Sequence, residues 1–288
     1  MPTQLHAIQR RTVRYARSGD VAIAYEVVGD GPLDVVLVPG FASHLDAAWD
    51  DPGLAEFQRL IGERARLILY DRRGQGLSDR TVTAPTIEQN CADLRLVLDA
   101  VGSRRTTLLA VSQGGPTAIA FAAAEPARTA GLVLYGTYAR ASAADDYPVG
   151  PTPDEARAFA ERMADGWGGD EAVAWFAPSR AEDATFRQWF ARSTRSALSP
   201  SGARTMLAGR ADLDVRDVLH QVTAPTLVIH RTEDRINPVE HGRYLARRLP
   251  HSQYLELPGE DHLWWVPNPA EIADAVTGFL DELEEGRS

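Results

Sequence analysis

Residues 106–124, TTLLAVSQGGPTAIAFAAA, limit most narrowly what this chain can fold into. The apolar run predicts a strand that ends at Val111, and the run of small residues predicts a helix from about Gly114. Only a sharp turn remains for Ser112 between them, so its hydroxyl should project from the carboxyl edge of a sheet. Strand and helix nearly touch in such a turn, and the small residues Ala110 and Gly114 allow this approach. The pattern A-x-S-x-G also fits an ordinary strand-to-helix turn, so the rest of the chain must decide.

Strand-like and helical segments alternate along most of the chain, which is typical of a parallel sheet covered by helices. The opening differs, because residues 12–16 and 21–28 are joined by a short turn and predict antiparallel edge strands. From 141 to 220 the chain has helical periodicity and no strand candidate. We therefore predict an α/β fold with a mostly parallel central sheet, an antiparallel N-terminal edge and flanking helices. The core would comprise 1–140 and 221–288, and 141–220 would form an inserted helical cap.

Composition excludes several classes of partner. The net charge of -10 argues against binding to nucleic acid or to an anionic membrane surface, since both would be repelled. The single cysteine, Cys91, rules out a disulfide framework or a cysteine-rich metal site, and we expect it to be a buried structural thiol. The N-terminal residues lack an apolar signal core, and no apolar stretch approaches membrane-spanning length. We expect a cytoplasmic protein.

A serine hydroxyl is too weakly acidic to attack a carbonyl unaided, so Ser112 needs a histidine base, which in turn needs an orienting carboxylate. Of the seven histidines, only His262 lies in a loop directly after a late strand and before the last helix. We predict that it is the base. The other histidines are expected in the N-terminal tail (His6), in the loop after the strand at 34–38 (His44), packed or in loops (His220, His230), or on a solvated surface (His241, His251).

The carboxylate should follow a strand between the serine and the histidine. Residues 226–238, TLVIHRTEDRINP, place Asp234 and Glu233 in a loop after an apolar run. A competing position after residues 129–136 offers no acid until Asp145. The residues alone leave both Asp234 and Glu233 open.

A tetrahedral intermediate carries negative charge, so two backbone N–H groups must point at its oxygen. Pro39 and Gly40 force a turn after the strand DVVLV, which leaves the amide of Phe41 facing inward. The amide of Gln113, next to the nucleophile, would be the second donor. The same residues also fit a plain turn.

The glycine-rich segment LILYDRRGQGLSDR invites a phosphate-binding interpretation. No helix opens at its glycines and no Lys-Ser/Thr pair follows, so the P-loop and dinucleotide fingerprints both fail. We assign it a structural role, in which Asp71 and Arg72 or Arg73 hold the loop near the nucleophile and Ser78 bonds locally.

Together these motifs resemble the α/β-hydrolase fold over essentially the whole chain. More narrowly, residues 17–52, the block AVSQGGP and GEDHLWW resemble hydrolase domains fused to actinobacterial adenylate and guanylate cyclases, and their stand-alone esterase and lactonase relatives, including a zearalenone-type lactonase. The resemblance favours Asp234 over Glu233, because a short loop followed by D-x-x-x-P recurs there in the family. Two positions depart from the usual pattern, Ala110 in place of glycine and Pro39 where many members have histidine.

The resemblance implies a serine hydrolase that cleaves a hydrophobic small ester or lactone with Ser112, Asp234 and His262, without metal or organic cofactor. A carbon-carbon bond hydrolase, a cofactor-free haloperoxidase and a non-enzymatic small-molecule sensor remain alternatives, and a homo-oligomer stays open. Aromatic residues of the cap and the loop beside His262 suggest an apolar pocket, although helix packing alone also explains such residues. The residues predicted to line this pocket are His44, Trp167, Trp175, Phe176, Trp189 and Trp264.

Overall fold

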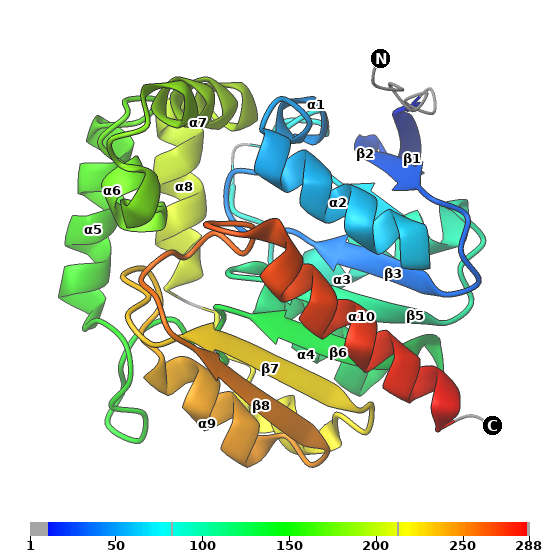
Figure 1. The fold of residues 1–288 in the computed structure, drawn as a ribbon. Helices are drawn as coiled ribbons and strands as arrows, with labels where there is room; N and C mark the ends of the chain where they lie inside the picture. The colour runs from blue at the N-terminus through cyan, green and yellow to red at the C-terminus, as the bar shows by residue number, and fades with distance from the viewer. Residues whose placement is uncertain (1–10, 82, 212, 287–288) are drawn as a thin grey trace.

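The computed structural model describes residues 11–81, 83–211 and 213–286. Its sheet has eight strands in the order β1-β2-β4-β3-β5-β6-β7-β8. The pairs β1–β2 and β2–β4 are antiparallel and the other pairs are parallel, which confirms the predicted α/β fold (Figure 1). The strands are β1 (Arg14–Ser18), β2 (Val21–Val28), β3 (Asp34–Val38), β4 (Arg66–Tyr70), β5 (Thr106–Val111), β6 (Thr129–Tyr135), β7 (Thr226–Arg231) and β8 (Ser252–Leu257).

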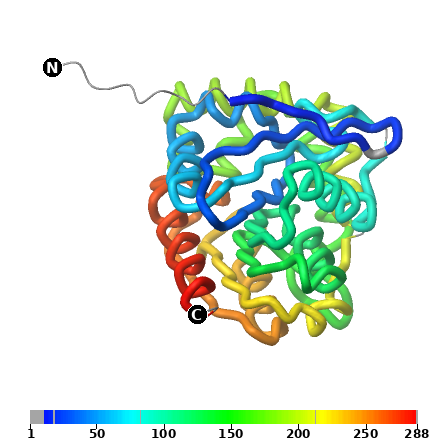
Figure 2. The backbone as a smooth tube through the Cα atoms, turned by 90° about the vertical axis from the view of Figure 1, so that its right-hand side faces the viewer, coloured from blue at the N-terminus to red at the C-terminus, as the bar shows by residue number. Residues whose placement is uncertain are grey.

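Helices cover both faces of the sheet, and a further group lies over its carboxyl edge (Figures 1 and 2). The α-helices are α1 (Leu45–Ala48), α2 (Pro52–Arg64), α3 (Ile87–Ala100), α4 (Gly114–Ala124), α5 (Pro153–Asp165), α6 (Val173–Phe176), α7 (Ala184–Ala197), α8 (Pro200–Arg210), α9 (Glu240–Arg248) and α10 (Pro269–Glu285). Three short 3-10 helices complete the described elements: η1 (Pro126–Arg128), η2 (Pro178–Arg180) and η3 (Arg216–Gln221).

The central strand β5 shows how the two cores form. All six of its residues are buried, and alternate side chains point to opposite faces. Leu109 and Val111 pack with α2 and α10, whereas Leu108 and Ala110 pack with α3, α4 and α9. Because β3, β5, β6, β7 and β8 run parallel, their carboxyl ends meet at one edge of the sheet. Loops from distant parts of the sequence therefore converge there.

Local sequence signals explain where the helices begin. Thr86 and Gln89 form a reciprocal capping box at the start of α3, and Thr152 and Glu155 do the same for α5. The Asp51 carboxylate accepts a hydrogen bond from the amide of Leu54 at 2.8 Å and caps α2. These caps satisfy amides that the first turn leaves without partners.

The segment predicted as a cap contains α5 to α8, and it lies beside the carboxyl edge in Figure 1. The last part of this segment packs against the core instead. η3 contacts α4 and α9, and Val215 and Leu219 are buried on the face of the sheet that α3, α4 and α9 cover. The division of the chain at 141–220 stays a prediction. As packing units, α5 to α8 lie over the sheet edge and η3 belongs with the core helices.

One histidine differs from its predicted place. His241 was expected on a solvated surface, but it lies on the inner face of α9 and is fully buried. Its Nδ1 is 2.7 Å from the hydroxyl of Tyr147. Burial, and to a smaller extent the charge of the nearby Arg210, lower the pKa of His241 to about 3. The helical period shows which residues share a face but not which face is buried, so the sequence could not place His241.

Acidification should therefore destabilise the protein through His241. Its pKa is below the ordinary value in the folded state, so the unfolded chain binds the additional proton, and stability is lost as pH falls below about 6.5. Each pH unit between there and the folded pKa should cost about 1.4 kcal/mol. Between pH 7 and pH 5, urea unfolding should show the wild-type protein losing about 2 kcal/mol more stability than His241→Gln, in which the contribution of His230 is retained. Equal pH dependence in both proteins would contradict this assignment.

Candidate active site

Ser112 lies on the turn between β5 and α4, as the sequence predicted. Its backbone has φ +49°, a left-handed conformation that is rare outside glycine and typical of strained functional turns. A Cβ built on Gly114 would lie 2.2 Å from the carbonyl oxygen of Val38, so a larger residue there would force β3 and α4 apart. The amide of Ser112 donates to the carbonyl of Tyr135 at 3.0 Å, which fixes the turn against β6.

Ser112, His262 and Asp234 form one hydrogen-bonded relay. The Oγ of Ser112 is 2.8 Å from the Nε2 of His262. The Nδ1 of His262 is 2.8 Å from the Oδ2 of Asp234. His262 and Asp234 are 4% and 6% exposed, so water is largely excluded from the two inner members. The structure thus brings together the three residues that the sequence singled out for a nucleophile, a base and an acid.

Asp234 is held in place by its own loop. Its Oδ1 accepts from the amides of Ile236 at 2.8 Å and Asn237 at 3.0 Å, which leaves Oδ2 for His262. Burial would raise the pKa of Asp234, but the charge and hydrogen bond of His262 outweigh this penalty and the pKa lies below its usual value. Glu233, the other candidate, is exposed and accepts from the amide of Gly259 at 3.3 Å.

Two further residues support this loop and were not predicted from the sequence. The side-chain amide of Asn237 donates to the carbonyl of Gly136 at 2.6 Å, which ties the loop after β7 to the end of β6. His230 is fully buried, as its predicted packed position requires, and its Nε2 is 2.8 Å from the carbonyl oxygen of Asn237. Burial lowers the pKa of His230, so it is neutral at pH 7 and donates this bond. The hydrogen bond between Asn237 and Gly136 joins residues 101 positions apart, which no local pattern reveals.

The loop after β3 lies against the nucleophile. A Cβ built on Gly40 would be 3.0 Å from the Cβ of Ser112. The amides of Ala42 and Ser43 donate to the side-chain oxygen of Gln75 at 2.8 and 3.2 Å. Among the described residues, the amides of Phe41 and Gln113 donate to no protein acceptor. This leaves those two N–H groups free for an oxyanion.

The glycine-rich segment after β4 has the structural role that its sequence suggested. Oδ2 of Asp71 accepts from the amides of Leu45 at 3.1 Å and Leu77 at 2.8 Å, so it ties two loops together. The hydroxyl of Ser78 donates to the carbonyl of Asp71 at 2.6 Å. Of the two arginines, Arg73 forms an ion pair with Asp93 of α3, and Arg72 is buried.

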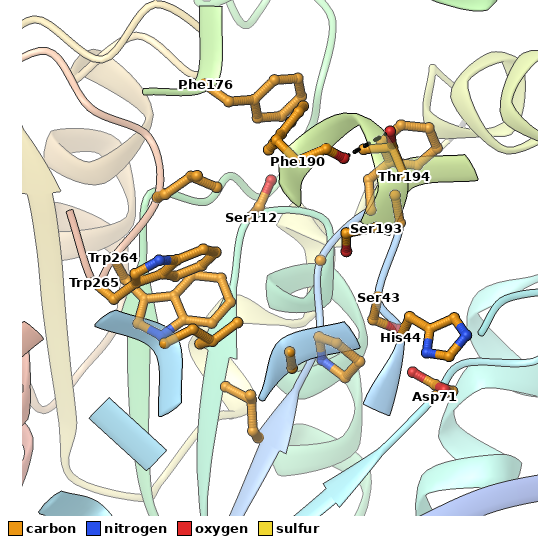
Figure 3. Close-up of a pocket in the computed structure, with 18 of the residues that line it drawn as sticks. Ser43, His44, Asp71, Ser112, Phe176, Phe190, Ser193, Thr194, Trp264 and Trp265 are labelled. Atoms are coloured by element: carbon orange, nitrogen blue, oxygen red, sulfur yellow. Dashed lines mark hydrogen bonds between the residues drawn. The ribbon is translucent and has the colours of Figure 1, made fainter. Parts of the chain in front are cut away.

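A cavity of about 140 Å³ opens in front of Ser112, between the sheet edge and the cap (Figure 3). Aromatic side chains from α6, α7 and the loop after β8 form its wall beside Ser112, and Ser43, His44 and Asp71 lie at its other end (Figure 3). The predicted pocket residues that line it are His44, Trp167, Phe176, Trp189 and Trp264.

Trp175 is the exception among the predicted pocket residues. It is 44% exposed and lines a different cavity, on the other side of the cap, so its expected place beside Ser112 is wrong. α6 is a single turn, so Trp175 and Phe176 point in different directions. Phe176 takes the inner position, and its carbonyl accepts from the amides of His262 at 2.9 Å and Leu263 at 3.2 Å. The cap is thereby bonded directly to the loop that carries the histidine.

Other candidate ligands are dispersed. No group of three or more His, Cys, Asp or Glu suited to a metal ion occurs in the described part of the chain. Cys91 is half-buried on α3, and burial raises its pKa to about 11. His220 and His251 are exposed, and His6 lies outside the described residues. Within 11–81, 83–211 and 213–286, no helix is long and apolar enough to cross a membrane.

The mixed sheet, the left-handed serine between β5 and α4, and the helices inserted after β6 define an α/β hydrolase. Residues 35–265 match the family described as the alpha/beta hydrolase fold, and the chain belongs to this family.

Similar proteins cover nearly the whole chain at low identity. A Caulobacter sp. (strain K31) protein provisionally named carbamate hydrolase RutD is 27% identical over 92% of this chain and 98% of its own length. The 3-oxoadipate enol-lactonase 2 of Acinetobacter baylyi is 25% identical over 91% of this chain and 94% of its own. A solved thermophilic esterase from Thermogutta terrifontis has a TM-score of 0.74 and 26% identity, and the match covers 95% of this chain and 99% of that one. The narrower likeness to cyclase-fused hydrolase domains stays a prediction.

Proposed function

We propose that this protein is a serine hydrolase that cleaves a carboxylic ester or lactone of a small hydrophobic molecule through an acyl-enzyme intermediate. The observation that carries the proposal is the relay from Ser112 Oγ through His262 to Asp234, with 2.8 Å at each contact. Relatives named as an esterase and an enol-lactonase support the same reaction class. Dehalogenases and epoxide hydrolases of this fold have an aspartate as the nucleophile in this turn and react by displacement. The serine in the turn between β5 and α4 fits acyl transfer instead.

In this mechanism His262 takes the proton of Ser112 as the serine oxygen attacks the carbonyl carbon. The amides of Phe41 and Gln113 stabilise the oxyanion of the tetrahedral intermediate. His262 then gives its proton to the leaving alcohol, which departs and leaves Ser112 acylated. Water, deprotonated by His262, hydrolyses the acyl-enzyme and releases the acid. Asp234 keeps the proton of the neutral imidazole on Nδ1, so that Nε2 faces the serine as an acceptor.

The dimensions and lining of the pocket support a small, apolar substrate. A cavity of about 140 Å³ is close to the space that one benzene ring occupies in a protein interior. Its wall near Ser112 is aromatic, which favours an apolar acyl or alcohol group. This volume favours short esters and small lactones over a large macrolactone of the zearalenone type.

A substrate panel tests the proposal. We expect acid release with many turnovers from p-nitrophenyl butyrate and small lactones, and a kcat/KM at least about tenfold lower for p-nitrophenyl dodecanoate, because its chain cannot be buried without displacing the cap. A carbamate ester belongs in the panel because of the relative of that name. A single stoichiometric burst would favour a sensor. Absence of turnover on every ester and lactone would refute the proposed reaction.

A further inference from the structure

A second cavity lies between the cap and the core, on the far side of the cap from the previous one. Its volume is about 490 Å³, and its walls come from α5, α6, α8, the loop 141–151 and the loop after β7. It shares no lining residue with the cavity at Ser112. Figure 1 shows α5, α6 and α8 gathered beside the carboxyl end of β7. Residues of these helices and of the loop after β7 line the cavity.

The charged residues of this cavity are unevenly balanced. Three arginines line it, against one acid, Glu155. Glu155 is committed to the capping box of α5, where its carboxylate accepts from the amide and hydroxyl of Thr152 at 2.8 and 2.9 Å. Arg235 pairs with Glu260. Arg162 and Arg210 have no carboxylate partner among the described residues, although the chain carries 40 acids against 30 bases.

The rest of the lining combines one free hydroxyl with apolar surface. Ser142 is 2% exposed, yet its Oγ has no hydrogen-bond partner within the described chain. A buried hydroxyl without a partner destabilises the folded protein, so a ligand atom that bonds to it there would recover stability. Phe159 and Trp175 meet edge to face with ring centroids 6.1 Å apart, and Trp175 keeps 44% of its surface exposed. An aromatic side chain left open beside a cavity is a ready apolar contact for a ligand.

We propose that this cavity is a second binding site, for a carboxylate with an apolar body. Arg162 and Arg210 would bind the carboxylate, since a guanidinium matches its two oxygens in a paired geometry. The hydroxyl of Ser142 would donate to the same group, and Phe159 and Trp175 would cover the apolar body. This site goes beyond the proposed hydrolase activity and does not depend on it.

Calorimetric titration of the whole protein with octanoate tests the proposal, with 1-octanol as the uncharged probe of equal chain length. We expect octanoate to bind at one site and 1-octanol to bind at least about tenfold more weakly there, because it cannot form the charge-assisted bonds. Arg162→Gln should weaken octanoate binding by about tenfold, and Ala156→Trp, which fills the cavity, should abolish it. Arg210 donates to the Oδ1 of Asn237. Arg210→Gln keeps a side-chain donor at this position and should also weaken octanoate binding.

Two measurements separate this site from the cavity at Ser112. Ser193→Phe narrows that cavity, because Ser193 lines it, and should leave octanoate binding unchanged. Quenching of Trp175 fluorescence by octanoate should disappear in Trp175→Phe. The proposal is wrong if octanoate does not bind at millimolar concentration, if Arg162→Gln and Ala156→Trp leave binding intact, or if Ser193→Phe alone removes it. Circular dichroism shows whether each variant is folded. Because Arg162 is exposed, Arg162→Gln is the variant least expected to disturb the fold.

Discussion

Replacing Ser112 with alanine is expected to lower turnover of p-nitrophenyl butyrate by roughly five to six orders of magnitude, because the members of a catalytic triad act as a unit. The variant should remain folded. Serine and alanine tolerate a left-handed backbone about equally badly, so the strain at φ +49° is the same in both proteins. Stopped assays of p-nitrophenol release and urea unfolding measure the two quantities separately.

The matched control is Ser193→Ala, since Ser193 lines the same cavity while the Nε2 of His262 bonds to Ser112. It should keep activity within about tenfold. A fluorophosphonate should label Ser112 in the wild-type protein and leave the Ser112→Ala variant unlabelled. Substantial esterase activity in a folded Ser112→Ala protein would mean that another group is the nucleophile.

The parts of the site that sequence analysis located are those encoded by short, consecutive patterns. The strand-turn-helix at Ser112 is one such pattern, because both flanking elements and the small residue at Gly114 are adjacent in sequence. The placement of His262 followed from the loop after a late strand, whereas the loop after β7 left Asp234 and Glu233 open until the family resemblance favoured Asp234. Parallel strands end at the same edge of the sheet. Once the strands are assigned, the loops that follow them are therefore expected to lie close together.

The features that sequence analysis missed depend on how elements pack. Trp175 and His241 each sit on a helix whose partners are set by distant segments, so periodicity could not say which way they face. The link from Asn237 to Gly136 joins loops 101 residues apart. The unpaired hydroxyl of Ser142 and the charge excess of the second cavity exist only because the cap lies where it does. Such contacts carry no local signature.

Asp234→Asn should reduce kcat by about four orders of magnitude with little change in KM, since the change alters the protonation of the base rather than substrate contacts. The two backbone amides of Ile236 and Asn237 decide how the new side chain is oriented. They donate to the Oδ1 of Asp234, so an asparagine must keep its carbonyl oxygen there and turn its amino group toward His262. That amino group is a donor, which forces Nδ1 to accept and moves the ring proton to Nε2. Nε2 then faces Ser112 as a donor and cannot take its proton.

Glu233→Gln is the matched control, because it makes the same chemical change one residue away. Glu233 is exposed and bonded only to the amide of Gly259 among the contacts seen, so its loss should cost less than about tenfold in kcat. Steady-state kinetics of both variants on p-nitrophenyl butyrate give the ranking directly. The reverse order would place the orienting acid at Glu233. Equal, small effects would show that His262 keeps its tautomer without a carboxylate, with Asp234 serving only to close the loop through its two amide bonds.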